Sequence, residues 1–473
     1  MTTGIWWIRR DIRLEDNPAL QEAVNHCSNL VPLFILDPAI LSHPAEHRKA
    51  FLFDGLRKLD IQLKKHGSKL IVILGDPLTV LKDMVTLIEA GGIYAEADYS
   101  PYSRKRDHGI AEKLPLWLVH GLTVFPPSMI QKQSGCPYTV YTHFSRAWKA
   151  LPLPAACCTD SEFKIPPLPE TLPESESIPV VGDGKPLLEA GETAAFERLR
   201  WFTSGPIFEY KEQRNLLAID GTSMLSPYLR FGMISIRGVV QEARFAIENA
   251  PNETARGSAQ AWLDELVWRE FYISILHYFP EVLKTSFRKD LRLIQWRNAP
   301  HDLTAWKQGM TGYPVVDAGM RQLKRTGWMH NRARMITASF LVKDLLINWQ
   351  EGEAWFMQNL LDGDPAANNG GWQWTAGVGT DAAPYFRIFN PVLQSQKFDP
   401  SGTYIRQWLP ELANVPDEYI HQPWLMPEDI QKSTSCEIGM NYPSPIVDHQ
   451  QIKARTLEAY HTGETPRQME TCS

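Results

Sequence analysis

The sequence predicts two architectures in one chain, an α/β domain with a parallel sheet and, after it, a large all-α domain. Residues 1–128 alternate short β-type runs with helix-period segments, which is typical of parallel sheets covered by helices. Residues 150–187 are rich in proline, and strand patterns become scarce from about Glu192 onward. We therefore expect domains at 1–128 and 192–473, joined by a connector at 129–191.

Five short apolar runs are the expected strands of the N-terminal sheet. They lie at Ile5–Ile8, Leu30–Leu36, Leu70–Leu74, Ile93–Ala95 and Leu122–Phe125. Helix-period segments such as His47–His66 and Pro77–Ala90 separate them. This order predicts a Rossmann-like parallel sheet. No G-x-G-x-x-G follows the first run, so a nicotinamide site is unsupported.

The rest of the chain divides into a connector and helices. Eight prolines fall between Pro152 and Pro186, and because proline lacks a backbone N–H and fixes φ, we expect no regular element there. Beyond it, apolar residues recur at helical spacing. The segments that show this spacing are Ala259–Leu276, Val315–Arg325, Asn331–Asn348 and Ala354–Leu361.

Composition excludes several classes of protein. No apolar run reaches the roughly 18 residues of a membrane span. The N-terminus MTTGIWWIRRD is charged within its first residues, unlike a secretory signal. We therefore expect a cytoplasmic protein without a membrane partner. The net charge of −6 means that any nucleic-acid face must be a local basic patch.

The cysteines and acidic residues predict no metal site and no disulfide framework. The six cysteines, Cys27, Cys136, Cys157, Cys158, Cys436 and Cys472, form no C-x-x-C pair and no Cys/His cluster. Asp362 and Asp364 lack the ligand spacing of a calcium loop. We expect free thiols in a reducing compartment.

Tryptophan is unusually frequent, with 16 in the chain. Nine of them lie at positions 262, 268, 296, 306, 328, 349, 355, 372 and 374. Composition alone favours a tryptophan-rich helical core. The alternative is that some of these rings carry electrons or stack on a flat ligand.

Four segments combine residue types that suit a ligand. Gly221–Ser226 brings hydroxyls and backbone amides ahead of a helix, which suits a diphosphate, although simple helix capping is the alternative. In Trp262–Tyr272, the residues Trp262, Glu265, Arg269 and Tyr272 share one helical face. That face suits the wall of a flat polar ligand, or else a surface ion pair beside core tryptophans.

The third segment, Trp328–Met335, presents Asn331, Arg334 and Met335 on one helical face. The fourth, Asp362–Trp374, holds two carboxylates, two amides and several glycines between tryptophans, and we interpret it as a polar loop.

These segments resemble the photolyase/cryptochrome family, most closely the class I cyclobutane-dimer photolyases of bacteria. The resemblance begins at Ile8–Pro18, includes Trp328–Met335 and Asp362–Pro391, and is weakest across residues 128–190. It implies an antenna-chromophore domain at 1–128 and a helical catalytic domain that binds FAD and DNA.

The resemblance implies specific cofactor residues. Those that would hold a U-shaped FAD are Tyr210, Thr222, Ser223, Met224, Leu225, Ser226, Trp262, Glu265, Arg269, Arg334, Asp362, Gly363 and Asp364, with Asn368 beside flavin N5. Met224 departs from a basic residue often seen at its position. Trp372, Trp349 and Trp296 match the electron-transfer chain of the family.

The resemblance also implies a DNA partner and a repair reaction. Reduced FAD, excited by light, would give one electron to a cyclobutane pyrimidine dimer that is flipped out of the duplex. Glu265, Asn331, Asn368 and Met335 would act in catalysis. The DNA face would comprise Arg214, Trp268, Asn331, Arg332, Trp374, Arg387 and Gln394.

Three alternatives remain open from the sequence. A cryptochrome would tend to need a C-terminal extension, and a (6-4) photolyase would carry a histidine pair where this chain has Met329-His330-Asn331. A non-enzymatic flavin-binding module would not need the combined substrate residues.

A second, antenna chromophore is expected. Ser100 replaces the glutamate of folate-type members, which weakens the folate interpretation and leaves a deazaflavin, a second flavin or no antenna chromophore. We expect a monomer.

Overall fold

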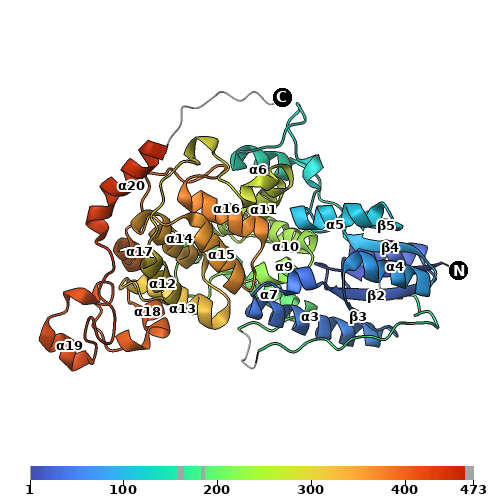
Figure 1. The fold of residues 1–473 in the computed structure, drawn as a ribbon, viewed down its shortest axis with the longest axis horizontal. Helices are drawn as coiled ribbons and strands as arrows, with labels where there is room; N and C mark the ends of the chain where they lie inside the picture. The colour runs from blue at the N-terminus through green and yellow to red at the C-terminus, as the bar shows by residue number, and fades with distance from the viewer. Residues whose placement is uncertain (1, 158–163, 183–186, 464–473) are drawn as a thin grey trace. The chain divides into compact units, whose positions relative to one another are not determined.

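The computed structural model describes residues 2–157, 164–182 and 187–463 (Figure 1). Their contacts form two compact units that do not follow chain order. The first unit comprises residues 1–211, 222–280 and 361–366, and the second comprises residues 212–221, 281–360 and 367–473. The domain boundaries expected from the sequence stay predictions.

A five-stranded parallel sheet lies in the first unit, as the sequence predicts. Its strands are β1 (Thr3–Ile8), β2 (Asn29–Leu36), β3 (Ile71–Leu74), β4 (Ala90–Glu96) and β5 (Leu116–Val119), in the order β3-β2-β1-β4-β5. Ile5 of β1 lies opposite Val31 and Ile93 of its two neighbours, and all three are fully buried. The direction of winding reverses between β1 and β4, as in doubly wound sheets.

Five helices of the described residues lie in the same region as the sheet (Figure 1), and four of them begin at a polar cap followed by proline. Asn17, Asp76 and Ser100 each accept a hydrogen bond from a backbone N–H of the first helical turn, which satisfies a donor that the helix itself cannot. The helices of this region are α1 (Pro18–His26), α2 (Pro38–Leu41), α3 (Glu46–Lys65), α4 (Pro77–Leu87) and α5 (Pro101–Ala111).

The predicted strand Leu122–Phe125 is wrong, because the fifth strand is β5. The run at 122–125 is buried, as its apolar character suggests, but side chains of one helix satisfy its backbone. The Val124 N–H donates to the Glu270 carboxylate, and the Leu122 carbonyl accepts from Arg269 at 3.1 Å. An apolar run can therefore be buried without forming a strand, and the sequence pattern does not distinguish the two cases.

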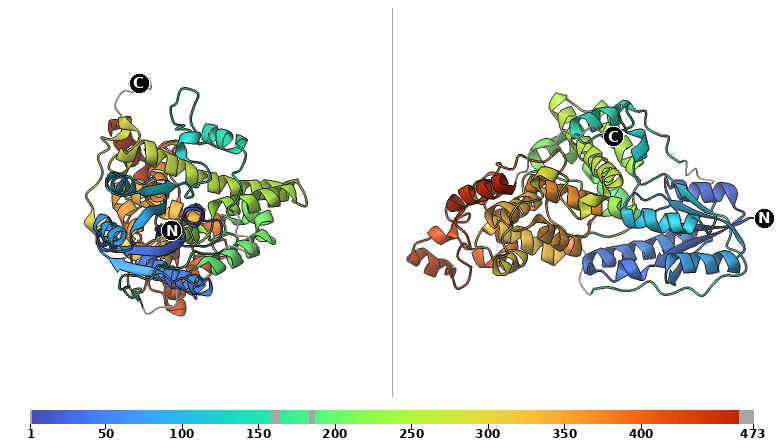
Figure 2. Two further views of the ribbon diagram at one scale, coloured as in Figure 1. Left: turned by 90° about the vertical axis from the view of Figure 1, so that its right-hand side faces the viewer. Right: turned by 45° about the horizontal axis from the view of Figure 1, so that its top comes forward.

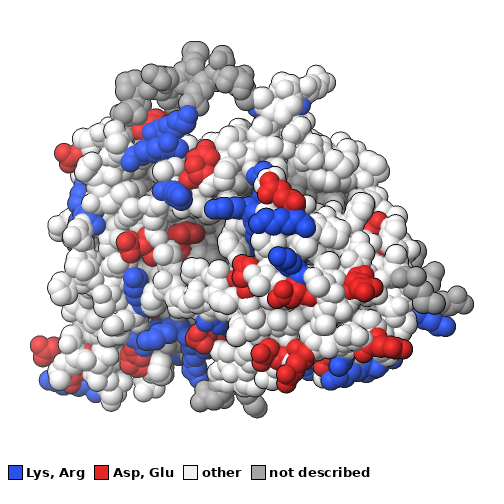
Figure 3. All heavy atoms as spheres, turned by 45° about the vertical axis from the view of Figure 1, so that its right-hand side comes forward, with Lys and Arg blue, Asp and Glu red and all other residues white. Residues whose placement is uncertain are grey.

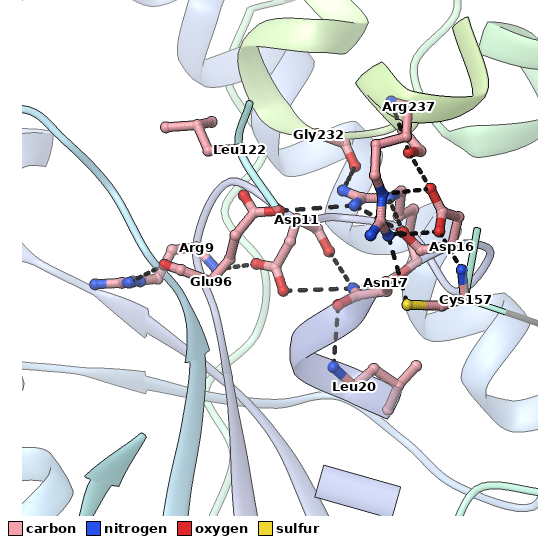
Figure 4. A network of polar contacts seen from close by, with 12 residues as sticks. Arg9, Asp11, Asp16, Asn17, Leu20, Glu96, Leu122, Cys157, Gly232 and Arg237 are labelled. Atoms are coloured by element: carbon pink, nitrogen blue, oxygen red, sulfur yellow. Dashed lines mark hydrogen bonds and ion pairs between the residues drawn. The ribbon is translucent and has the colours of Figure 1, made fainter. Parts of the chain in front are cut away.

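The loop between β1 and α1 encloses a network of charged groups (Figure 4). Asp11 accepts from the Trp6 indole at 3.0 Å, and Arg13 donates to the Asp16 carbonyl at 2.9 Å. Arg237 forms two hydrogen bonds with the Asp16 carboxylate, at 2.5 and 3.1 Å. The loop is thus fixed by hydrogen bonds among its own polar residues and by the ion pair with Arg237 of helix α10 (Ile236–Glu248).

The helical part of the first unit follows an irregular connector. Its helices are α6 (Tyr141–Ala150), α7 (Glu192–Thr203), α8 (Tyr210–Gln213, which runs on into the second unit), α9 (Ser226–Phe231), α10 (Ile236–Glu248) and α11 (Glu253–Tyr278). The described residues between α6 and α7 contain no helix or strand, as the prolines predict. Helix α6 lies inside the range expected as connector.

The second unit is helical throughout its described core (Figure 2). Its helices are α12 (Pro300–Gln308), α13 (Pro314–Thr326), α14 (Asn331–Ser339), α15 (Trp349–Asn359), α16 (Pro365–Ala376, which begins in the first unit), α17 (Pro391–Phe398), α18 (Thr403–Trp408), α19 (Glu428–Thr434) and α20 (His449–Gly463). One hydrophobic cluster contains Trp306, Trp349, Trp372, Leu341 and Tyr404. Part of the tryptophan excess therefore does build a core.

Two sequence expectations need correction here. The helix expected at Asn331–Asn348 ends at Ser339, passes into a π-helical turn at Phe340–Asp344, and is followed by Leu346 at a φ of 52°. The polar loop expected at Asp362–Trp374 is wrong from Pro365 onward, where α16 begins. Asp364 accepts from the Ala366 N–H at 2.9 Å, so a carboxylate cap and a proline start a helix despite the glycines that follow.

Several global features concern the described residues alone. None of their helices is long and apolar enough to cross a membrane, and they contain no cluster of three metal-ligating side chains. Among the described residues, Cys27, Cys136, Cys157 and Cys436 form no disulfide, whereas Cys158 and Cys472 lie outside the described residues. Basic and acidic side chains are interspersed over the face shown in Figure 3.

Candidate functional site

A backbone turn in the first unit presents N–H groups that have no acceptor among the described residues. Met224 has a φ of 49°, and Leu225 follows at φ −84° and ψ −7°. Successive left- and right-handed residues aim their N–H groups into one concavity that suits an anion. Among the described residues, no hydrogen bond engages the N–H groups of Thr222–Leu225.

The carbonyls of the same turn are held from the opposite side. Arg198 donates to the Ser223 carbonyl at 2.9 Å and to the Thr222 carbonyl at 2.7 Å. Simple helix capping, the alternative for these hydroxyls, is not observed. The cap of α9 is Leu225, which has no side-chain bond, and Ser226 donates instead to Asp362 at 2.6 Å.

Aromatic residues expected at the cofactor cluster around the turn. The Trp262 indole donates to the Ser223 hydroxyl at 3.3 Å. Trp262 and Tyr210 both pack on Phe202, with ring centroids 4.9 and 5.9 Å away. The structure thus brings three predicted residues together through Phe202, which sequence reasoning did not identify.

Helix α11 carries three more of the predicted residues. Glu265 and Arg269 are half-buried and one turn apart, and Arg269 binds the Leu122 carbonyl. Trp268 stacks on Tyr141, with ring centroids 3.7 Å apart and planes 4° from parallel. Tyr141 lies 127 positions from Trp268 and was missed, because nothing local to either residue indicates the pairing.

The predicted acidic segment is neutralised by arginines. Asp364 forms ion pairs with Arg10 at 2.6 Å and Arg230 at 3.8 Å. Burial would raise the pKa of Asp364, but Arg10 and then Arg230 hold it below its usual range. Arg230 also donates to the Gly363 carbonyl at 2.7 Å. Asp364 therefore adds no net negative charge at this end of α16.

Helix α14 of the second unit carries Asn331, Arg334 and Met335 as predicted. Asn331 is exposed, and Arg334 donates to the Met329 carbonyl at 2.8 Å. His330 caps the helix, since its Nδ1 accepts the Arg332 N–H at 3.1 Å. Burial first, and then Arg334 and Arg332, lower the pKa of His330 to about 4, so the cap stays neutral at physiological pH.

Three predicted arginines come together in the second unit. Arg332 donates twice to the Asn215 side-chain oxygen, at 3.1 and 2.6 Å, and lies 4.4 Å over the Phe398 ring. Burial lowers the pKa of Arg332, and Arg214 and Arg387 lower it further. Their mutual repulsion marks a concentration of positive charge on an otherwise acidic chain.

The remaining predicted residues lie on neighbouring helices and loops of the second unit. Trp374 on α16 and Gln394 on α17 are half-buried, and Arg387 is exposed. Asn368 on α16 is 8% exposed and donates to Glu353 of α15. Glu353 was not identified from the sequence.

The three tryptophans expected to carry electrons pack in or against one core cluster. Trp372 and Trp349 are each 2% exposed, and Trp296 is partly buried at the edge of the cluster. Trp372 contacts Phe356 and Trp306, with centroids 4.9 and 6.0 Å away, and its indole N–H has no partner among the described residues. Their electron-transfer role stays a prediction.

Comparisons with known proteins agree across the chain. Residues 4–169 match the family described as DNA photolyase, and residues 262–462 match the FAD binding domain of DNA photolyase. A Deoxyribodipyrimidine photo-lyase of Synechococcus is 42% identical, covering 94% of this chain and 93% of that protein.

Two solved structures are also similar. One is a class III photolyase of Agrobacterium tumefaciens, with a TM-score of 0.90, 37% identity and 98% coverage of both chains. The other is a Synechocystis cryptochrome, with a TM-score of 0.88, 30% identity, and coverage of 97% and 99%. On these matches to sequence, profile and structure, the chain belongs to the DNA photolyase family.

Proposed function

We propose that this protein binds FAD and uses light to split cyclobutane pyrimidine dimers in DNA. The observation that carries the proposal is 42% identity over nearly the whole chain, through both compact units, to a relative named Deoxyribodipyrimidine photo-lyase. The class I assignment and the individual site residues are part of the proposal.

The residues present fit FAD. The unpaired N–H groups of Thr222–Leu225 suit a diphosphate, and Asp364, already paired with Arg10, does not repel it. Bound FAD supplies the light absorption and the electron. The cradle would comprise Tyr210, Thr222, Ser223, Met224, Leu225, Ser226, Trp262, Glu265, Arg269, Arg334, Asp362, Gly363, Asp364 and Asn368.

The DNA contacts divide into two kinds. Arg214, Arg332 and Arg387 would meet phosphates, which position the duplex without reading its sequence. Trp268 and Trp374 would form apolar walls for the flipped dimer, and Glu265 and Asn331 would hydrogen-bond pyrimidine edges. Met335 and Gln394 complete this proposed face.

Trp372, Trp349 and Trp296 would resupply electrons to the cofactor. Because the Trp372 N–H has no acceptor among the described residues, loss of an electron would leave its proton in place. A pure electron relay requires no proton exit, which favours this assignment.

Three further expectations belong to the proposal. Ser100 caps α5, accepting from Ser103 at 3.4 Å, so it offers no carboxylate to a folate, which favours a deazaflavin or second flavin as antenna. A monomeric state and a cytoplasmic location are also part of the proposal. Analytical ultracentrifugation and cell fractionation test these last two.

A cryptochrome function is the second candidate, favoured by the similarity to the Synechocystis protein. A (6-4) photolyase is disfavoured because Asn331 and Met335 occupy helix α14 beside a single histidine, His330. Dimer repair separates these candidates, since a cryptochrome signals without repairing.

Two variants and two assays test the proposal. Trp296→Phe should block light-driven flavin reduction with an external thiol, yet repair dimers normally once the flavin is reduced chemically. Glu265→Ala should show normal photoreduction and poor repair, because a buried unpaired polar group costs about 1–3 kcal/mol. If Trp296→Phe loses repair with pre-reduced flavin, the assigned relay is wrong.

A further inference from the structure

The Asn368 side chain can offer a ligand a hydrogen-bond acceptor but no donor. Its Nδ2 donates to the Glu353 backbone carbonyl at 3.0 Å and to Glu353 Oε1 at 3.2 Å. An amide nitrogen has two N–H groups, and one residue takes up both. The Oδ1 atom, a pure acceptor, is what Asn368 can offer to anything bound beside it.

Glu353 fixes this orientation from the facing helix. If the amide turned over, Oδ1 would face two acceptor oxygens, and both would lose their donors. Burial raises the pKa of Glu353 and the hydrogen bond from Asn368 lowers it, with no charged side chain of the described residues shifting it further. Apart from burial, the protonation of Glu353 therefore depends on its hydrogen bond with Asn368.

We propose that Glu353 is a positioning residue that makes Asn368 an acceptor-only partner and so favours the flavin forms that carry hydrogen on N5. The inference rests on the proposed function, which assigns Asn368 to flavin N5. Oxidised flavin has a lone pair at N5 and cannot donate to Oδ1, whereas reduced forms have an N5–H that can. A group that only accepts discriminates between these forms.

The one-electron potential of the bound flavin measures this discrimination, and it needs no DNA. Glu353→Leu releases an N–H of Asn368 and removes one acceptor that opposes the turned-over amide. We expect the ratio of N5-protonated to oxidised flavin to fall about tenfold, which is about 59 mV for a one-electron couple. The control is Glu351→Gln, which also removes one carboxylate from the same helix but at an exposed position. It should leave the potential unchanged.

Glu353→Gln separates hydrogen bonding from charge. Its amide oxygen can still accept from Asn368, so we expect partial rescue relative to Glu353→Leu. In the wild type the carboxylate becomes protonated as pH falls through its raised pKa, so its advantage is present at high pH and lost at low pH. The wild-type and Glu353→Gln potentials should therefore converge as pH falls.

Two outcomes overturn the proposal. One is a Glu353→Leu potential equal to that of Glu351→Gln. The other is a pair of potential-against-pH curves, for the wild type and Glu353→Gln, that stay parallel. If Glu353→Leu does not retain FAD, this second outcome decides alone. A protein that binds FAD but repairs no dimer would refute the proposed function and leave this test intact.

Discussion

Two polar segments of the first unit treat their hydrogen bonds in opposite ways. The loop between β1 and α1 binds its charges to one another and to Arg237 (Figure 4). Both segments are rich in polar residues. Among the described residues the loop leaves one buried side-chain donor unpaired, Arg9 Nε, whereas the turn at Thr222–Leu225 leaves a row of consecutive backbone N–H groups unpaired. A closed network maintains a fold, and an open one can bind a ligand.

The largest expected effect comes from opening the closed network. Asp16→Ala leaves Arg237 as an uncompensated charge with 10% of its side chain exposed, which costs about 3–5 kcal/mol. Thermal unfolding should show a large loss of stability, while the fraction of folded protein that retains FAD stays unchanged. Asp83→Ala, on the exposed face of α4, is the matched control. If Asp16→Ala lost FAD while keeping normal stability, the loop between β1 and α1 would have a role beyond maintaining the fold.

Closing the open turn should instead damage binding. Met224→Val puts a β-branched residue at a φ of 49°, a strain of about 1–3 kcal/mol that the turn can relieve only by changing shape. FAD affinity, measured by titration of apo-protein, should fall about tenfold or more. Met224→Gly accepts this backbone conformation and should bind FAD normally. Equal affinities for the two variants would show that the shape of the turn does not matter.

The loop network also predicts a pH effect at Glu96. Its Oε1 lies 3.6 Å from Arg13 Nη2 but has no hydrogen-bond partner among the described residues, and burial raises the pKa of Glu96 to about 7, with Arg13 opposing the shift. A raised carboxyl pKa contributes stability below pH of about 4.5 that is lost as pH rises through about 7.

Glu96→Gln mimics the protonated acid and should therefore stabilise the protein at pH 8, by about 1–3 kcal/mol, and change little at pH 5. Unfolding by urea at the two pH values checks this. Glu192 and Glu270 also have raised pKa values and will keep part of the pH slope. An equal effect of Glu96→Gln at both pH values would exclude a buried acid.

The smallest effect concerns the arginine cluster of the second unit. Arg332→Ala should weaken binding of damaged and undamaged DNA alike and reduce the salt slope by about one, because a phosphate contact is blind to sequence. Trp268→Ala should instead weaken binding of damaged DNA selectively, since stacking contributes about 1–3 kcal/mol per base. Electrophoretic binding assays at several salt concentrations compare the two. Parallel losses for both variants would remove the distinction between positioning and recognition.

Local patterns predicted much of the fold. β1 to β4 follow from apolar runs, and α3 and α4 follow from the helix-period segments His47–His66 and Pro77–Ala90. β5 was misassigned because the burial of residues 122–125 comes from side chains of α11, far along the chain. Helix α16 was mistaken for a loop because its glycines outweighed the cap at Asp364.

The site shows the same division between local and distant information. Residue types such as Asn368 and Arg332 could be recognised in place. The residues that orient them, Glu353 and Asn215, lie 15 and 117 positions away and resemble ordinary surface residues in the sequence. Orientation is a property of tertiary contacts, so only a structure could supply it.

Light-dependent reversal of thymine dimers tests the proposed function most directly. Purified protein with chemically reduced FAD is mixed with an oligonucleotide that contains one dimer, and parallel samples are illuminated or kept dark. We expect restoration of intact thymines in the illuminated sample and none in the dark. A protein that binds FAD and the oligonucleotide, yet restores no thymine under light, would contradict it.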